Sequence, residues 1–230
     1  MTLRAILLDL GGPVLNEDAE YEAWARFLRG ALSAEGIAVP EPEFSREVHT
    51  GIARCDPNPY LSAAWAFVRP DVGRFRRIQI AFREHRRAFG ADLRGVEVRP
   101  EAREVIPALG ERFLLALAAN QPQAVLSLLE KAGLLDHFSW RYVSEGMGVA
   151  KPSPLFFRMI LDGLGVSADE AVMVGDRVDF DVHPAKLMGM KTVRVLVGPY
   201  AGQEPVSPFH VPDRTISTLS DLSPALASFL

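Results

Sequence analysis

The 230-residue chain is long enough for one large domain or two modest ones, and its 48% hydrophobic content is that of an ordinary globular protein. Its formal net charge of −4 argues against nucleic acid or an anionic membrane as a partner, so an anionic ligand would have to be held by local groups. The single cysteine, Cys55, excludes an intrachain disulfide and a cysteine zinc cluster, and the absence of a signal-peptide or membrane-span pattern predicts a cytoplasmic protein.

Four short apolar runs lie along the chain, at residues 4–9, 112–119, 171–175 and 191–197. Their hydrophobicity is continuous rather than alternating, which is typical of strands covered on both faces, as in a parallel sheet. Helical patterns lie between the later runs, at residues 123–132, 154–164 and about 181–188. This alternation predicts an α/β fold with a doubly wound, Rossmann-like parallel sheet.

The pattern changes between about residues 17 and 93, where it indicates helices without a strand, interrupted by several prolines. An all-helical stretch directly after the first strand of a parallel sheet predicts a separate, inserted domain. We therefore expect an α/β core of residues 1–16 and 94–230 and a helical cap domain of residues 17–93. Residues 198–208 have the composition of a surface loop, and a short helix is expected from about residue 219.

Three of the apolar runs end on polar residues, at Asp9, at Asn120 and at Gly175-Asp176. Because the carboxyl ends of parallel strands line one crevice, we expect these groups to converge. A lone aspartate after a strand is usually only a turn former, but two at the same edge favour a functional site. Two neighbouring carboxylates repel each other unless a cation lies between them, and Mg²⁺ suits such oxygen ligands.

Further charged and glycine residues accompany these strand ends. Lys151 precedes a helix with prolines in its first turn, so its ammonium could meet an anionic substrate, although an exposed lysine is the alternative. The turn at Gly11 and Gly12 could present N–H groups to the same anion. Asp181 has two interpretations, an N-cap of the next helix or a metal ligand, and Asp179 is expected to be solvated.

Four segments of the chain read LLDLGGPV, LALAANQP, GVAKPSP and VMVGDRVDFD, and they begin at residues 7, 115, 148 and 172. In this order they resemble the four motifs of the haloacid dehalogenase-like (HAD) hydrolase superfamily. The helical insertion falls where the C1-type cap of that family falls. The resemblance implies a Mg²⁺-dependent hydrolase, foremost a phosphatase that acts on a small phosphorylated substrate through an aspartyl-phosphate intermediate.

The resemblance also implies a role for each matching position. Asp9 would be the nucleophile, and Lys151 would pair with Asp9 and with the substrate phosphate. Asp9, Asp176, Asp181 and the main-chain carbonyl of Gly11 would hold the metal. Asp9, Lys151 and Asp176 would thus form the catalytic set.

The substrate phosphate would be bound by groups from three of the motifs. These are Gly12, Ala119, Asn120 and Lys151. Two positions depart from the family pattern, because Gly11 replaces the general acid and base, and Ala119 replaces a hydroxyl residue. Positioned proton transfer contributes roughly 10²–10⁴-fold to a rate, so a weak or leaving-group-selective enzyme is expected unless another group, such as His183, supplies the proton.

Two other interpretations of the sequence stay open. The chain could be a catalytically impaired HAD-fold protein that binds a ligand or partner without turnover. It could also be a metal-free enzyme like the haloacid dehalogenases, which the stretch AANQPQ favours and which the acid at Asp176 argues against. The sequence does not distinguish a monomer from a homodimer.

Overall fold

The computed structural model describes residues 2–93 and 95–229, without the side chains of residues 89–92. The chain forms two compact units, one of Met1–Glu17 with Glu97–Leu230 and one of Asp18–Val96. We call the first the core unit and the second the helical unit. The sequence-based boundaries stand at 16/17 and 93/94, whereas the compact units divide at 17/18 and 96/97.

The core unit is built on a five-stranded sheet with the strand order β4-β1-β5-β6-β7, in which every pair is parallel. The strands are β1 (Ala5–Leu8), β4 (Leu114–Leu117), β5 (Ala171–Gly175), β6 (Lys191–Val195) and β7 (Arg214–Ile216). The predicted doubly wound α/β fold is confirmed, and the first four strands lie in the four apolar runs. The edge strand β7 was not predicted, because only the last of its three residues is buried.

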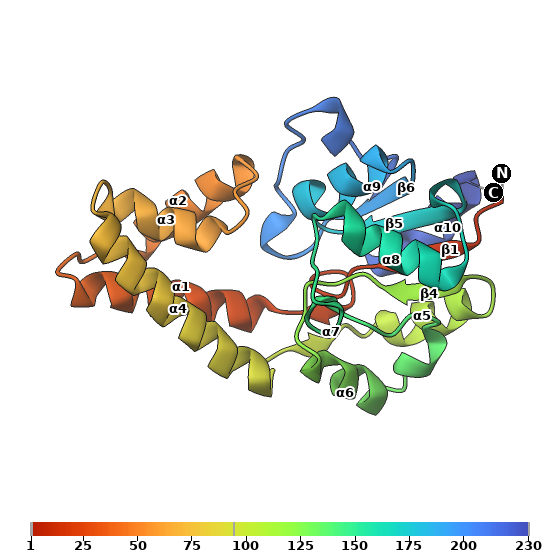
Figure 1. Ribbon diagram of the computed structural model, residues 1–230, viewed down its shortest axis with the longest axis horizontal. Helices are drawn as coiled ribbons and strands as arrows, with labels where there is room; N and C mark the ends of the chain where they lie inside the picture. The colour runs from red at the N-terminus through yellow and green to blue at the C-terminus, as the bar shows by residue number, and fades with distance from the viewer. Residues whose placement is uncertain (1, 94, 230) are drawn as a thin grey trace. The chain divides into compact units, whose positions relative to one another are not determined.

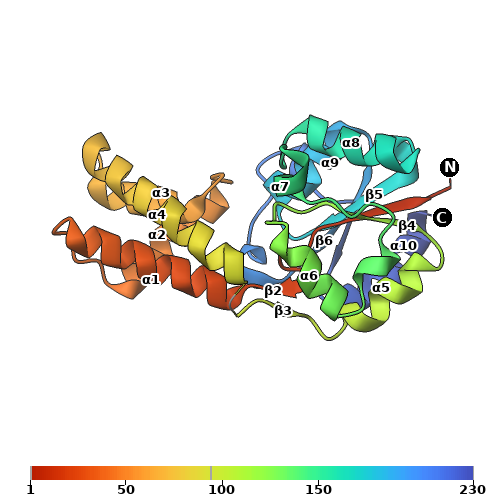
Figure 2. The same ribbon diagram turned by 60° about the horizontal axis from the view of Figure 1, so that its bottom comes forward.

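Helices cover both faces of the sheet (Figures 1 and 2). On one face lie α8 (Pro154–Leu164) and α9 (His183–Leu187), and on the other lie α5 (Ala102–Gly110) and α10 (Leu222–Leu226). The core unit also contains α6 (Ala124–Lys131) and α7 (Ser144–Met147). This layering leaves both faces of the central strands dry, as their uninterrupted apolar sequences predict.

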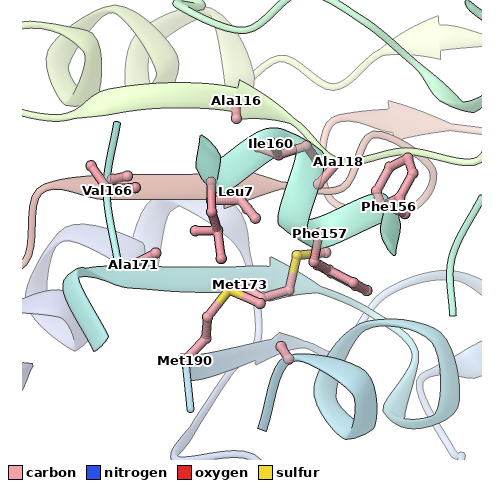
Figure 3. Close-up of a cluster of buried hydrophobic side chains, with 13 residues drawn as sticks. Leu7, Ala116, Ala118, Phe156, Phe157, Ile160, Val166, Ala171, Met173 and Met190 are labelled. Carbon is pink, nitrogen blue, oxygen red and sulfur yellow. The ribbon is translucent and has the colours of Figure 1, made fainter. Parts of the chain in front are cut away.

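Helix α8 is defined by residues suited to its two ends. Pro154 stands at the first helical position, where the missing N–H costs nothing, and Gly165 follows the last turn with φ 64°. Its apolar stripe packs on the sheet (Figure 3). Alanines in and beside the strands leave a flat surface for the helix, and the phenylalanine and isoleucine side chains of α8 fill the layer between the helix and the sheet. The cluster includes Ala5, Leu7, Ala116, Ala118, Phe156, Phe157, Ile160, Ala171 and Met173.

A short antiparallel ribbon joins the two points at which the chain leaves and re-enters the core unit. It consists of β2 (Leu15–Asn16) and β3 (Glu97–Val98), with Leu15 opposite Val98. Arg99 extends the pairing through its N–H, which donates to the carbonyl of Val14 at 2.8 Å. Strands of two residues carry no recognisable hydrophobic period, so the sequence did not predict this ribbon.

The helical unit contains α1 (Asp18–Ala34), α2 (Glu41–Ala53), α3 (Pro59–Val68) and α4 (Val72–Asp92), which confirms the all-helical insertion. The side chain of Asn58 caps α3, and that of Asp71 caps α4. Half-buried Trp24 meets the buried rings of Tyr60 and Phe82 edge-to-face at 5.6 and 5.8 Å between ring centroids. Trp24 therefore packs against the core of this unit.

Among the described residues, no helix is both long enough and apolar enough to cross a membrane.

Two helical glycines provide a matched test of the packing. A Cβ on Gly163 of α8 would stand 2.1 Å from the ring of Trp140, whereas a Cβ on Gly30 of α1 would meet nothing within 4 Å. We expect Gly163→Ala to destabilise the protein by about 1–3 kcal/mol through overpacking. Gly30→Ala should stabilise it by about 0.5–1 kcal/mol, because alanine restricts the unfolded chain more than glycine does. Urea unfolding of both variants measures this, and a Gly163→Ala protein as stable as the wild type would contradict the packing described.

Candidate active site

Asp9 and Asp176 follow neighbouring strands of the sheet. Strand β1 pairs with β5 so that Leu8 lies opposite Val174, and the N–H of Asp9 donates to the carbonyl of Val174 at 2.8 Å. Both aspartates therefore emerge at the carboxyl edge, where a parallel sheet gathers its ligands. Both are buried, with exposed fractions of 8% and 3%.

A third buried carboxylate, that of Asp181, joins them. Asp9, Asp176 and Asp181 each offer an oxygen within 4.8 Å of those of the other two. Asp181 comes from a π-helical turn, Val178–Val182, that follows β5 directly and brings the chain back over the strand end. Three carboxylates gathered in this way form a donor set of the kind that hard divalent cations prefer.

Lys151 brings one positive charge into this cluster. Its Nζ lies 2.9 Å from Oδ2 of Asp9 and 2.5 Å from Oδ1 of Asp181, and the side chain is 2% exposed. The interpretation of Lys151 as an ordinary exposed lysine is therefore wrong. The lysine joins residues that are far apart in the chain, since it precedes α8 while Asp9 follows β1.

The main chain at Lys151 is fixed by Asn120 at the end of β4. The N–H of Lys151 donates to Oδ1 of Asn120 at 2.8 Å, and Nδ2 of Asn120 donates to the carbonyl of Lys151 at 2.9 Å. Asn120 was expected to contact the substrate, but both ends of its amide bind this segment, so it positions Lys151. Ala119, the other predicted binding residue of this motif, is fully buried, and its carbonyl accepts from the N–H of Ser144.

The charges of the cluster do not balance. Burial raises the pKa of Asp9 to about 7, although Lys151 opposes the shift. The pKa of Asp176 is raised well above its usual range, first by burial and then by the charges of Asp9 and Asp181. Burial lowers the pKa of Lys151, but Asp181 and Asp9 outweigh it and leave the pKa raised. One ammonium among three carboxylates leaves negative charge that a divalent cation would neutralise.

The two glycines after Asp9 have different surroundings. Gly12 has φ +87°, and a Cβ there would stand 2.9 Å from Oδ2 of Asp176, so this turn needs glycine both for its backbone and for close approach. The N–H of Gly12 donates to the carbonyl of Leu15 at 3.0 Å. Because this donor is used within the turn, the arrangement argues against the expected contact of Gly12 with an anion.

Gly11 lies beside a carboxylate that the sequence did not single out. A Cβ on Gly11 would stand 2.5 Å from Oε2 of Glu17, a buried residue directly after β2. Oε1 of Glu17 accepts a hydrogen bond from Nε2 of Gln121 at 2.5 Å. No motif marks Glu17 or Gln121 as partners, because they are 104 residues apart and meet only when β1 and β4 pair.

Asp179 and Asp181 differ from their sequence-based interpretations. Asp181 does not cap the next helix, because the N-cap position of α9 is Val182, without a side-chain bond. Its Oδ2 accepts instead from the N–H of Arg177 at 3.0 Å. Asp179 was expected to be solvated but is buried, with Oδ1 and Oδ2 at 3.0 and 2.5 Å from the guanidinium of Arg177.

Arg177 lies within a network that supports the strand end at Asp176. Its guanidinium lies 3.8 Å from the ring centroid of Phe180 and 4.4 Å from that of Tyr200. Gln203 donates to Asp179 from its Nε2 at 3.1 Å, and its Oε1 accepts from the N–H of Val178. Tyr200 and Gln203 are both buried, so the prediction that residues 198–208 form a surface loop is wrong at these two positions.

Arg194 of β6 adds a main-chain anchor to the same region. Its Nε donates to the carbonyl of Asp176 at 3.2 Å and its Nη2 to the carbonyl of Tyr200 at 2.8 Å. A buried arginine in an apolar strand satisfies its donors in this way, and the loop and strand end are fixed together. His183, named above as a possible proton source, stacks on His210 with ring centroids 4.5 Å apart.

The sequence of this chain is similar to those of known hydrolases. A model of the haloacid dehalogenase-like hydrolase family matches residues 3–189. The phosphoserine phosphatase of Thermus thermophilus is 37% identical over 142 residues, which are 61% of this chain and 55% of that protein. The glyceraldehyde 3-phosphate phosphatase of Methanocaldococcus jannaschii is 42% identical over 94 residues, 41% of this chain and 40% of that protein. The matches thus span about half the length of these relatives.

Solved structures share the fold over the whole chain. An HAD phosphatase from Thermococcus onnurineus has a TM-score of 0.63 and 23% identity, covering 97% of this chain and 98% of its own. A 2-haloacid dehalogenase from Pseudomonas syringae has a TM-score of 0.60 and 20% identity, covering both chains completely. At these identities the two structures show the fold and leave the reaction open. Because the family model covers most of the sequence, this chain belongs to the haloacid dehalogenase-like hydrolase family.

Proposed function

We propose that this protein is a Mg²⁺-dependent phosphatase of small phosphorylated molecules. The observation that carries the proposal is the buried cluster of Asp9, Asp176 and Asp181 around Lys151. The names of its relatives, phosphoserine phosphatase and glyceraldehyde 3-phosphate phosphatase, agree with a phosphate monoester as the substrate. The absence of a net positive charge on the chain suits a small substrate better than a polyanion.

Asp9 is the group that we assign as nucleophile. Its Oδ1 accepts from the N–H of Leu10 at 2.8 Å, and its Oδ2 faces Lys151, so the carboxylate is held in one orientation. The ammonium favours the ionised, nucleophilic form against the effect of burial. Attack of an Asp9 oxygen on phosphorus would release the substrate alcohol, and water would then cleave the aspartyl phosphate.

Lys151 would have a second task in the same reaction. An ammonium between Asp9 and Asp181 lies beside the phosphorus that Asp9 attacks, and it would offset the charge of the phosphoryl oxygens. Asp181 directs Lys151, because its Oδ1 accepts from Nζ while its Oδ2 is fixed by the N–H of Arg177. This use of both oxygens favours a positioning role for Asp181 over direct metal ligation.

The donor set fits Mg²⁺. Asp9, Asp176 and the carbonyl of Gly11 would hold it, with Asp181 near by. All of these ligands are oxygens, which Mg²⁺ prefers, and it commonly completes its shell with water and substrate phosphate. When bound, the ion would neutralise the excess negative charge of the carboxylates and polarise the phosphoryl group. A metal-free dehalogenase would leave Asp176 and Asp9 buried together without that compensation.

Loss of the nucleophile gives the first test. With Mg²⁺ and a panel of phosphate monoesters, we expect Asp9→Asn to lower kcat at least about 10³-fold, because the amide is a poor nucleophile. The matched control Asp162→Asn removes an exposed carboxylate from α8 and should leave the rate unchanged. Equal rates for wild type and Asp9→Asn would contradict the proposal and favour a binding protein. Full activity in excess EDTA would contradict the metal requirement.

Thermal unfolding gives a second test, independent of turnover. Because the pKa of Asp9 is raised from 3.8 to about 7, the metal-free folded state binds a proton between these pH values that the unfolded state has lost. Stability in EDTA should therefore fall as the pH rises from 5 to 8, and Asp9→Asn should reduce this fall. At pH 8 the free energy of unfolding lost by the wild type should exceed that lost by Asp9→Asn by an amount on the order of 2 kcal/mol, which corresponds to about 4–8 °C in Tm.

Mg²⁺ should offset the loss of wild-type stability at high pH. At pH 8 it should raise the Tm of the wild type and leave that of Asp9→Asn nearly unchanged, because a ligand that binds only the folded state stabilises it. Differential scanning calorimetry at several Mg²⁺ concentrations measures the effect. A wild-type Tm that is insensitive to Mg²⁺ would rule out the proposed ion site.

A further inference from the structure

Gly11 occupies the position at which the resemblance described above expects a general acid and base. Its φ lies outside the left-handed region, so the backbone does not require glycine there. The neighbouring side chain of Glu17 explains why a glycine stands at this position. A Cβ at this position would stand 2.5 Å from Oε2, 3.2 Å from Cδ and 3.4 Å from Oε1 of Glu17. The carboxylate of Glu17 thus fills the space into which a side chain at position 11 would project.

This carboxylate is held in place. Glu17 directly follows β2, which is paired with β3, and the residue is 6% exposed. Its Oε1 accepts from Nε2 of Gln121, which follows the end of β4. Oε2 is the oxygen closest to Gly11. The carboxylate of Glu17 is thus buried, held at Oε1 by Gln121, and placed beside Gly11 on its Oε2 side.

Glu17 also lies near Asp9, the proposed nucleophile. Gly11 is two residues from Asp9, and the charge of Glu17 is among those that act on Asp9. The cluster of Asp9, Asp176 and Asp181 with Lys151 contains no hydroxyl, thiol or imidazole that could deliver a proton. His183 is engaged in a stack with His210.

We propose that Glu17 is the proton donor and acceptor of this enzyme, with its carboxylate in the place left open by Gly11. This inference rests on the proposed phosphatase function. In the first step an Asp9 oxygen bonds to phosphorus, the bond from phosphorus to the leaving oxygen breaks, and the Glu17 carboxyl gives its proton to that oxygen, which leaves as an alcohol. In the second step ionised Glu17 takes a proton from the water that attacks phosphorus, the bond from phosphorus to Asp9 breaks, and inorganic phosphate is released.

The test compares two substrates that differ in their need for a proton. Phenolate leaves slowly unless it is protonated, whereas 2,4-dinitrophenolate leaves without help. We compare kcat/KM, which reports the first step alone, because the second step is common to both substrates. With Mg²⁺, Glu17→Gln should lower kcat/KM for phenyl phosphate roughly 10²–10⁴-fold and for 2,4-dinitrophenyl phosphate less than tenfold. The matched control Asp18→Asn, which removes the adjacent exposed carboxylate, should leave both rates unchanged. An equal loss of kcat/KM on both substrates, or no loss on phenyl phosphate, would overturn the role of Glu17 as proton donor.

A relocation experiment separates proton transfer from a structural role. Glu17→Ala alone should lose activity on phenyl phosphate, and the double variant Gly11→Asp/Glu17→Ala should recover at least tenfold of it, because the carboxylate returns to position 11. Circular dichroism melting shows whether each variant is folded. A folded double variant no more active than Glu17→Ala would contradict the assignment.

Asp9→Asn in the same assays distinguishes this inference from the function on which it rests. If Asp9→Asn removes turnover of both substrates, the phosphatase function stands, and the Glu17 variants decide the inference alone. If Asp9→Asn retains the wild-type rates, the phosphatase function and the inference fail together.

Discussion

Burial of Asp9, Asp176 and Asp181 around one ammonium is the interaction on which the candidate active site depends. Removing a carboxylate from water is costly, and a single buried ion pair often does no more than offset that cost. Lys151 contacts two of the three acids, so negative charge is left over inside the protein. Such a cluster is unfavourable for the unliganded fold and favourable for a cation and a phosphate, which is the trade between stability and function that active sites commonly make.

The fold supports this cluster by bringing distant segments to one edge of the sheet. β1 lies between β4 and β5, so the residues that follow these three strands meet at one edge of the sheet. They do so although more than 100 positions of the sequence separate β1 from β4. Around this edge, hydrogen bonds between main chain and side chain fix each part. Asn120 holds the main chain of Lys151, and Arg194 holds the carbonyl of Asp176. The N–H of Arg177 holds the carboxylate of Asp181. The acids therefore cannot relieve their repulsion by moving apart.

The sequence predicted those parts of the site that depend on strand ends and short motifs. Asp9 and Asp176 could be placed together because they end adjacent apolar strands, and Lys151 because its motif precedes a helix. Residues whose partners lie far away in the chain escaped prediction: Glu17 meets Gln121, and Arg177 meets Tyr200, through side-chain contacts that no local pattern encodes. Of the two interpretations of Asp181, the helix cap was wrong because a π-helical turn, which has no recognised sequence signal, precedes α9.

The β2–β3 ribbon has a consequence for how such a protein can change. Since Asn16 lies opposite Glu97, the segment between them begins and ends at neighbouring points of one ribbon. Most of that segment is the helical unit, Asp18–Val96, which is continuous in sequence and has its own interior, whereas Glu17 and the residues of the candidate site belong to the core unit. Evolution or design can therefore exchange the helical unit for another of different length while the residues of the candidate site stay in place.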